Sequence, residues 1–336
     1  MSNEGVSRRD MLGLAAASIA AEAPLMASTG AGVAAVAGAS ATAAAAKPAP
    51  TAAAAPVPVD RGFIRLQEGL VHYRFAGREH LGRRGAPLPV YFAHAGPGSG
   101  RVYEPYLQAF GANRFAFAPD MLGNGDSAPP AGEVLEIGYY VDCALRLADQ
   151  LGLERFDFYG SHTGAQIGCQ LAVEHPGRIR RLVLDGIPLF PPDLKQRMLE
   201  NYAPKIEPDD YGTHLVWAWN FVRDQQLYFP WFERTGARRL SNPVPPAAQL
   251  QASVADVVKA LRTYHIAYRA AFRQDLHALL PKVRCPVFLT TSQRDPLTAW
   301  FDDALRLAPA GSPHAIFTPA TTMAERLAAI AGFLDA

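Results

Sequence analysis

The segment Gly160-Ser161-His162-Thr163-Gly164 has the spacing of a sharp turn that presents a nucleophile. A strand pattern, Phe156–Tyr159, runs into it, and a helix pattern, Ala165–Ala172, runs out of it. The two glycines let the backbone turn sharply and let the strand and the helix approach closely. The residue at the centre is therefore exposed at the carboxyl end of a strand. That residue is His162, whose imidazole can serve as a general base or attack an acyl group itself.

Ser161 is the alternative nucleophile if the motif is shifted by one residue. The glycine spacing argues against the shift, because Gly160 and Gly164 flank His162 symmetrically. Histidine also tolerates a positive φ angle better than most residues, as the centre of this turn requires. We therefore assign the exposed position to His162 and keep Ser161 as a secondary candidate.

Two other segments carry groups that could take part in catalysis. His94-Ala95-Gly96-Pro97-Gly98 directly follows the strand pattern Val90–Ala93. Alone, the segment is more typical of a tight glycine-proline loop, but followed by the turn at His162 it favours backbone N–H groups that hold a developing oxyanion. Asp295 precedes Pro296 after the strand pattern Pro286–Thr290, which suits a catalytic acid and also a helix N-cap.

The elements that must position these residues follow an alternating order from residue 60 onward. Phe63–Leu66 and Val71–Phe75 have the pattern of an antiparallel N-terminal hairpin. Short apolar runs typical of strands buried on both faces then alternate with helix patterns. These runs are Leu88–Ala93, Arg114–Ala118, Phe156–Tyr159, Leu182–Leu184 and Val287–Thr290, and the helix patterns include Val141–Leu151, Gly164–Glu174 and Met323–Leu334. The alternation predicts an α/β fold with a mainly parallel, doubly wound sheet.

Residues 188–280 interrupt this alternation, because they lack a strand pattern and are rich in helix formers and aromatic residues. We expect a helical lid inserted between two core strands, with the core formed by residues 60–187 and 281–336. An aromatic lid favours an apolar or aromatic small substrate. Candidate substrate-binding residues are therefore Trp217, Trp219, Trp231 and His214, together with His94; packing between the lid helices is the alternative for each aromatic residue.

These segments, with the turn Ala118-Pro119-Asp120-Met121-Leu122-Gly123-Asn124-Gly125-Asp126-Ser127, resemble the α/β-hydrolase fold superfamily over residues of about 60 to 336. The resemblance implies that Gly96 and Thr163 donate the N–H groups of an oxyanion hole and that Asp295 is the acid of a catalytic triad. It implies a mainly structural role for the turn at Asp120. The His-Thr-Gly elbow resembles that of a little-characterised branch of the superfamily.

One departure from the family pattern concerns the base of the triad. The family presents a histidine after its last strand, whereas this chain reads Thr318-Pro-Ala-Thr-Thr322 after His314–Phe317. An ordinary serine triad is therefore excluded. We expect His162 and Asp295 to form a dyad that hydrolyses a small apolar or aromatic ester or lactone. Two alternatives stay open: a lyase-type reaction with His162 as general base, and a catalytically silent protein that binds a ligand.

Composition limits the partners of the protein. The 336 residues are 49% hydrophobic with a formal net charge of +1, which suits one large domain and gives no electrostatic reason to expect nucleic acid. Clustered metal-ligand and dinucleotide-binding patterns are lacking, so we expect neither a metal nor a cofactor. Cys143, Cys169 and Cys285 have no zinc-type spacing and are expected to be buried thiols, although a Cys143–Cys169 disulfide stays possible. A homodimer is left open.

Residues 1–59 have the pattern of a targeting segment and a tether. Arg8-Arg9 precedes a weakly hydrophobic, alanine-rich stretch, and an Ala/Pro/Thr-rich stretch follows. This arrangement resembles a bacterial twin-arginine export signal. We expect a periplasmic or secreted protein with no membrane association beyond export; the alternative is a disordered N-terminus with an accidental arginine pair.

Overall fold

The computed structural model describes residues 57–336, so the expected export signal lies outside the described residues. The strands are β1 (Asp60–Leu66), β2 (Gly69–Ala76), β3 (Val90–Ala93), β4 (Ala116–Pro119), β5 (Phe156–Ser161), β6 (Ile179–Asp185), β7 (Val287–Ser292) and β8 (His314–Phe317). The helices are α1 (Glu104–Phe110), α2 (Ile137–Gln150), α3 (Thr163–Glu174), α4 (Pro192–Asn201), α5 (Thr213–Leu227), α6 (Ala247–Lys259), α7 (Tyr264–Arg273), α8 (Leu276–Leu279), α9 (Phe301–Leu307) and α10 (Met323–Asp335).

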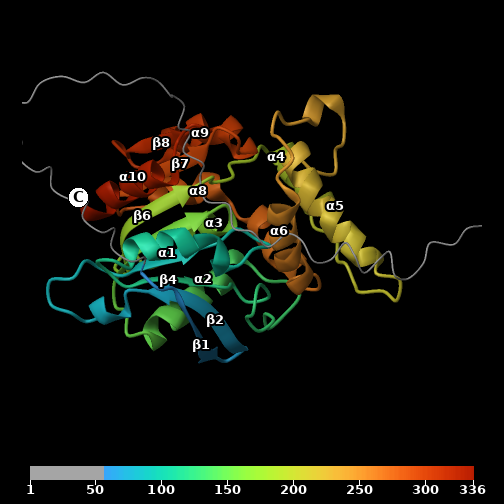
Figure 1. The fold of residues 1–336 in the computed structure, drawn as a ribbon. Helices are drawn as coiled ribbons and strands as arrows, with labels where there is room; N and C mark the ends of the chain where they lie inside the picture. The colour runs from blue at the N-terminus through green and yellow to red at the C-terminus, as the bar shows by residue number, and fades with distance from the viewer. Residues whose placement is uncertain (1–56) are drawn as a thin grey trace, which may run out of the picture. The chain divides into compact units, whose positions relative to one another are not determined.

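The strands form one sheet in the order β1-β2-β4-β3-β5-β6-β7-β8 (Figure 1). The hairpin partners β1 and β2 are antiparallel, and β2 is also antiparallel to β4. All other neighbours pair in parallel, including β3 with β5 and β5 with β6. The prediction of a mainly parallel, doubly wound sheet with an N-terminal hairpin is therefore confirmed.

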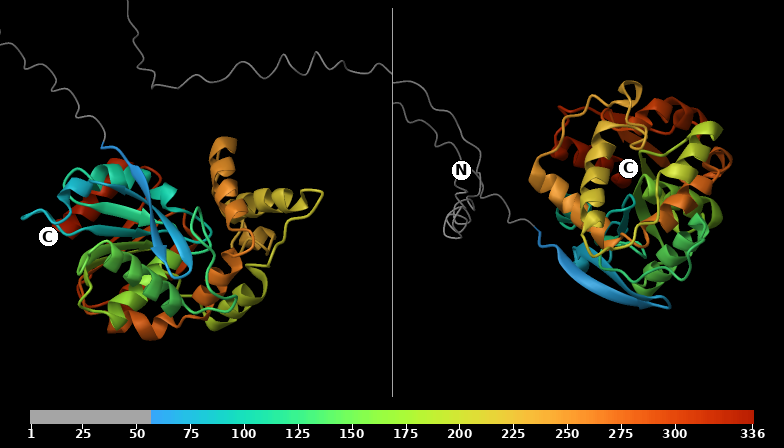
Figure 2. Two further views of the ribbon diagram at one scale, coloured as in Figure 1. Left: turned by 90° about the horizontal axis from the view of Figure 1, so that it is seen from below. Right: turned by 90° about the vertical axis from the view of Figure 1, so that its right-hand side faces the viewer.

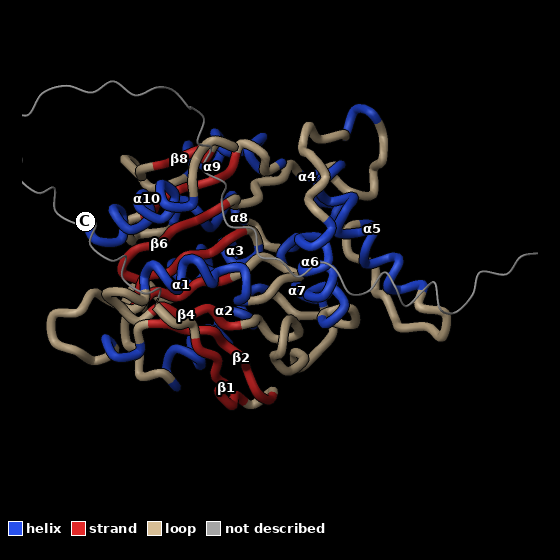
Figure 3. The backbone as a smooth tube through the Cα atoms, in the orientation of Figure 1, coloured by secondary structure: helices blue, strands red, loops and turns tan. Residues whose placement is uncertain are grey.

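Helices cover both faces of the sheet, because side chains along each buried strand alternate between two apolar cores (Figure 3). Phe92 and Tyr159 pack on one face against α1 and α10, where Phe92 contacts several aromatic rings. Tyr91 and Phe158 stack on the other face, beneath α2 and α3. Successive residues of the central strands are thus buried on opposite sides, and the sheet is held rigidly between two layers.

Helices α4 to α7 come between β6 and β7 in the chain, and residues 188–280 are called the helical insertion below. It has an apolar cluster of its own, built around Met198, Phe221, Trp231, Val257 and Tyr264. The ribbon views place α4, α5 and α6 together at one side of the sheet (Figures 1 and 2). The insertion therefore faces the loops at one edge of the core.

All three cysteines are free thiols, so the possible Cys143–Cys169 disulfide is not formed. Cys143 and Cys169 are buried, and Cys285 is half-buried. Within residues 57–336, no helix combines the length and the apolar character needed to span a bilayer.

Candidate active site

His162 occupies a strained turn between β5 and α3. Its backbone has φ 48° and ψ −109°, and it is the only non-glycine residue with positive φ among the described residues. Its N–H donates to the carbonyl of Asp185 at 2.9 Å, which ties the turn to the end of β6. A Cβ at Gly160 would collide with the carbonyl of Gly164, and a Cβ at Gly164 would collide with that of Ala93. The two glycines are thus required by close backbone approach, and the side chain between them is held out from the sheet.

The His162 and Asp295 side chains form a direct hydrogen bond. Nε2 of His162 lies 2.6 Å from Oδ2 of Asp295, whose other oxygen accepts the Leu297 N–H at 2.9 Å. The carboxylate therefore fixes the proton of the neutral imidazole on Nε2. Nδ1 has no hydrogen-bond partner among residues 57–336, and the imidazole borders a large cavity. The His162 side chain is 43% exposed, so this nitrogen is accessible to a ligand.

Each member of the pair stabilises the charged form of the other. Burial alone would lower the pKa of His162, but the charge and the hydrogen bond of Asp295 outweigh it and raise that pKa above its usual value. Burial alone would raise the pKa of Asp295, but the charge and hydrogen bond of His162 hold it below its usual value. The pair is therefore suited to taking up a proton on the imidazole while the carboxylate stays ionised.

The Gly96 loop and the start of α3 meet beside the imidazole. Gly96, His162 and Thr163 line the same cavity, and a Cβ on Gly96 would lie 3.7 Å from Oγ1 of Thr163. The backbone N–H groups of Gly96 and Thr163 have no acceptor among the described residues. The structure thus brings together the four residues that the sequence predicted for the dyad and the oxyanion hole.

Ser161, the secondary nucleophile candidate, is not among the residues that line the cavity. The Tyr103 hydroxyl donates to the carbonyl of Ala93 at 3.0 Å, so the Ser161 hydroxyl donates to the Tyr103 oxygen at 2.9 Å. Tyr103 belongs to the apolar core on the α1 side of the sheet. Successive residues point in opposite directions at the end of β5, and Ser161 takes the direction away from the dyad.

His94 is not brought to the cavity either, although it was predicted to contact substrate. Its Nε2 accepts the Met121 N–H at 3.0 Å, and its Nδ1 then donates to the carbonyl of Ala95 at 2.8 Å. The side chain is 1% exposed, and this burial lowers its pKa. His94 is a neutral residue that fixes the shape of the Gly96 loop.

The cavity beside the dyad has a volume of about 750 Å³ and lies between the core loops and the helical insertion. Its walls are mainly apolar and aromatic. The insertion contributes Phe190, Tyr202, Phe229, Tyr268 and Phe272. These residues were not identified from the sequence, because single aromatic residues in amphipathic helices carry no sign of which cavity they face.

The structure places the predicted substrate-binding residues of the insertion elsewhere. Trp217 stacks on Phe221 at a centroid distance of 4.8 Å, and the indole N–H of Trp231 donates to the Tyr202 carbonyl at 3.0 Å. Trp219 packs against the same apolar cluster of the insertion. His214 accepts the backbone N–H of Asp209 and borders a separate cavity. The tryptophans thus form the interior of the insertion instead of the wall of the cavity beside His162.

The segment after β8 starts a helix, where the family would present its histidine. Thr322 is the N-cap of α10, and its side chain and that of Glu325 form a reciprocal capping box. Nearby, the Arg326 guanidinium lies 4.4 Å from the centroid of the Phe317 ring. This segment supplies no imidazole, so Asp295 has His162 as its partner.

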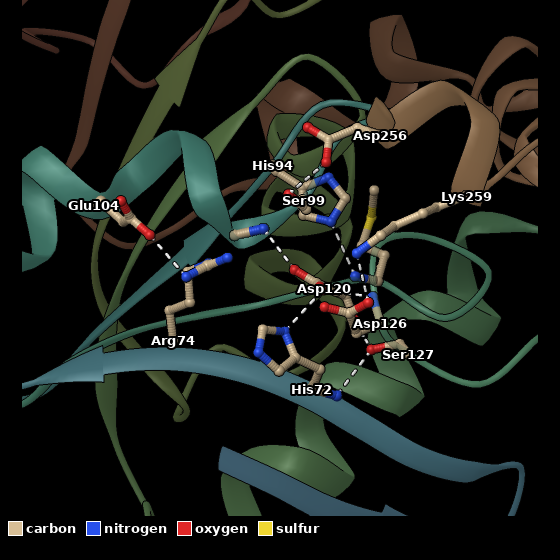
Figure 4. Close-up of polar contacts among 12 residues, drawn as sticks. His72, Arg74, His94, Ser99, Glu104, Asp120, Asp126, Ser127, Asp256 and Lys259 are labelled. Atoms are coloured by element: carbon tan, nitrogen blue, oxygen red, sulfur yellow. Dashed lines mark hydrogen bonds and ion pairs between the residues drawn. The ribbon is translucent and has the colours of Figure 1, made fainter. Parts of the chain in front are cut away.

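The Asp120 turn forms a hydrogen-bond network near His94 and Ser99 (Figure 4). Asp120 accepts from the His72 ring and from the N–H groups of Gly100 and Asp126, and Lys259 of α6 contacts the Asp126 carboxylate at 2.6 Å. His72, Asp120 and Asp126 are close enough together to hold a metal ion. Their oxygens already accept these N–H and ammonium groups, which fits a structural network better than a metal site.

The insertion is tied to the Gly96 loop through Asp256 of α6. One oxygen of Asp256 accepts the Ser99 hydroxyl at 3.0 Å, and the other contacts the Arg101 guanidinium at 2.8 Å (Figure 4). Ser99 follows Gly96-Pro97-Gly98 directly. Helix α6 is therefore fixed to the loop that carries the Gly96 N–H.

Comparison with known proteins agrees with this architecture. The sequence model of the family described as the alpha/beta hydrolase fold matches residues 89–316. The 2-hydroxymuconate semialdehyde hydrolase of Pseudomonas sp. (strain CF600) is 38% identical over 115 residues, which are 32% of this chain and 40% of that enzyme. The chain thus matches less than half the length of this curated relative.

Solved structures of the same architecture cover nearly all of the described residues. The enol-lactonase from Burkholderia xenovorans LB400 aligns with a TM-score of 0.58 and 18% identity, over 82% of this chain and 97% of the lactonase. Epoxide Hydrolase A from Mycobacterium thermoresistibile aligns with a TM-score of 0.61 and 18% identity, over 83% of this chain and 98% of the hydrolase. At this level of identity the likeness concerns the fold alone.

Proposed function

Because this chain belongs to the α/β-hydrolase fold family, we propose that it hydrolyses a small acyl compound with an apolar or aromatic body, such as an ester or a lactone. The observation that carries the proposal is the 2.6 Å hydrogen bond between His162 and Asp295, with the second imidazole nitrogen free beside the cavity. The name of a similar protein gives further support, since it is a semialdehyde hydrolase.

In the proposed mechanism, Nδ1 of His162 removes a proton from a water molecule. The oxygen of that water attacks the acyl carbon, and the carbonyl oxygen becomes an oxyanion that accepts the N–H groups of Gly96 and Thr163. Asp295 stabilises the imidazolium that has formed. When the intermediate collapses, the leaving oxygen takes the proton from Nδ1, so that the products are an acid and an alcohol and His162 is neutral again.

General-base catalysis is favoured over attack by His162 itself. An acyl-imidazole would have to form first, whereas a water molecule needs only the free Nδ1 lone pair and an accessible acyl carbon. Ser161 has no place in this mechanism, because its hydroxyl is bonded to Tyr103 outside the cavity.

The experiment compares hydrolysis of small aromatic acyl esters by the wild type with that by His162→Ala, Asp295→Asn and Ser161→Ala. We expect His162→Ala to lose turnover and Ser161→Ala to keep it within a few-fold, with unchanged circular dichroism for both. Asp295→Asn should lose roughly 10²-fold or more in kcat. Full activity of His162→Ala would refute the proposal. Ligand binding without turnover in every variant would instead support a catalytically silent protein.

We also propose export through the twin-arginine pathway, on the basis of Arg8-Arg9 and the alanine-rich stretch that follows. Cell fractionation of a bacterium that expresses the full chain tests this. Replacement of both arginines by lysine should retain the protein in the cytoplasm, and equal export of the two forms would contradict the proposal.

A further inference from the structure

Among the polar side chains that the helical insertion presents to the cavity, three are joined to one another by hydrogen bonds. Tyr202 follows α4, Gln225 lies on α5 and Tyr268 lies on α7, and all three line the cavity beside His162. The Gln225 amide nitrogen donates to the hydroxyl of Tyr202 at 3.1 Å and to that of Tyr268 at 3.4 Å. The two phenol rings lie 5.2 Å apart between centroids. We call these residues the donor trio.

The donor trio has more hydrogens to donate than it uses internally. The amide uses its two hydrogens on the two phenol oxygens. The two hydroxyls also interact with each other, which raises the pKa of Tyr268 and lowers that of Tyr202. If the amide were turned over, its oxygen would accept both phenol hydrogens and its own two hydrogens would be unused. In either orientation, a ligand oxygen that replaces the contact between the two hydroxyls can accept two hydrogens. Tyr202 is only 7% exposed, so a ligand oxygen that displaces water there meets a largely dry site.

The phenols remain donors at any physiological pH. Burial, with a contribution from the Asp295 charge, raises the pKa of Tyr202 to about 12. Burial also raises the pKa of Tyr268 well above its usual value. The effect of Asp295 on Tyr202 means that the field of the dyad carboxylate reaches this part of the cavity.

The charged residues that line the cavity favour a neutral hydrogen-bond acceptor as the ligand of the donor trio. Among the described lining residues, the only permanent cation is Arg294, which lies beside Asp295 on the core loop after β7 and not on the insertion. A carboxylate at the trio would therefore lack a cationic partner and would be repelled by Asp295. A neutral carbonyl oxygen has two lone pairs for the two hydrogens and no net charge to repel.

We propose that the donor trio is a carbonyl-binding subsite, which selects aromatic or conjugated acyl substrates that carry a second, neutral carbonyl group away from the bond to be broken. The surrounding rings of Phe190 and Phe272 contact the flat body of such a substrate. The identity of the reacting acyl group rests on the proposed hydrolysis, whereas binding of the second carbonyl at the trio needs no turnover.

The test uses two matched hydrocinnamic acids, one with a para-acetyl group and one with a para-isopropyl group of similar shape. Their primary amides serve as binding probes in isothermal titration calorimetry, and their methyl esters serve as substrates. Each neutral hydrogen bond increases the binding constant by a factor of about five. With two hydrogen bonds to the acetyl oxygen, the wild type should bind the acetyl amide roughly 30-fold more tightly than the isopropyl amide. The same preference is expected in kcat/KM for the esters.

The variants are Tyr202→Phe/Tyr268→Phe, which keeps both rings, and Gln225→Leu. Loss of the acetyl preference in at least one of them, with the affinity for the isopropyl amide unchanged within about threefold, supports the subsite. The matched control is Tyr211→Phe, because Tyr211 is 92% exposed and does not line the cavity; it should keep the preference.

Two results would overturn the subsite: a wild type without preference for the acetyl amide, or a preference that survives in both variants. Failure of the proposed hydrolysis has a different signature. It would show as no turnover of either ester together with an intact preference between the amides, and that preference would still support the subsite.

Discussion

Gly186 lies against the dyad and offers a test of how closely the site is fitted. It directly follows β6 with φ +66°, and an added Cβ would lie 2.7 Å from Cδ2 and 2.8 Å from Nε2 of His162. It would also lie 2.9 Å from Oδ2 of Asp295. Ordinary contacts between such atoms begin near 3.5 Å, so Gly186→Ala must displace the imidazole or the carboxylate by roughly 0.6 to 0.8 Å.

A displacement of this size should be costly for catalysis. A misplacement of about 1 Å can reduce the rate roughly 10²-fold, so we expect kcat/KM of Gly186→Ala to fall by about that factor for any ester that the wild type hydrolyses. The added Cβ also strains a backbone with positive φ, at about 1 to 2 kcal/mol. The effect of backbone strain on stability must therefore be separated from the effect of the displaced dyad on the rate.

Gly152→Ala is the matched control, because Gly152 has φ +72° and a Cβ there would meet nothing within 4 Å. It shares the backbone strain of Gly186→Ala without touching the dyad. Thermal unfolding should show a decrease in Tm of a few degrees for both variants. Kinetics should show wild-type kcat/KM within about twofold for Gly152→Ala only. Equal activity of the two variants would refute the argument that the steric fit around His162 and Asp295 governs the rate.

Three further predictions concern the dyad, a helix start and the core. In Asp295→Asn the charge that does most to raise the pKa of His162 is removed, while burial and the weaker effect of Asp185 remain, so the acidic limb of the kcat/KM–pH profile should move to lower pH; an unchanged or higher limb would contradict the dyad. Thr322→Ala should cost about 1 kcal/mol in the free energy of unfolding by urea, and Thr322→Ser should restore it, because the hydroxyl is the N-cap of α10. Phe92→Ala should cost about 3–5 kcal/mol in the same measurement, whereas Phe63→Ala, at a side chain that is 54% exposed, should cost less than 1 kcal/mol.

The parts of the fold that were predicted correctly from the sequence are those that depend on residues close together in the chain. Gly160 and Gly164 predict the turn at His162, because a side chain at either position would collide with a neighbouring carbonyl. The strand β3 consists of apolar residues alone, and the buried strands β5 and β7 are rich in apolar residues in their first half. Such signals lie within a few residues of each other and need no knowledge of distant partners.

Features that depend on distant partners were missed. The strand β6 begins at Ile179, three residues before the predicted start. The prediction missed these residues because Arg180 interrupts the apolar pattern. Arg180 pairs with the buried Asp157 of β5 at 2.6 Å, and only the assembled sheet reveals that partner. The donor trio is a similar case, because Tyr202, Gln225 and Tyr268 come from different helices and no single-helix pattern connects them.

The buried thiols make the protein convenient for site-directed labelling. The whole sequence contains only Cys143, Cys169 and Cys285, and burial raises the pKa of these thiols to about 12, 12 and 11. At neutral pH almost none of them is present as the reactive thiolate. A single cysteine introduced at the exposed position Tyr211 would therefore react with a maleimide fluorophore without removal of any native cysteine. The fluorescence of that label would report on the surroundings of Tyr211 in the helical insertion.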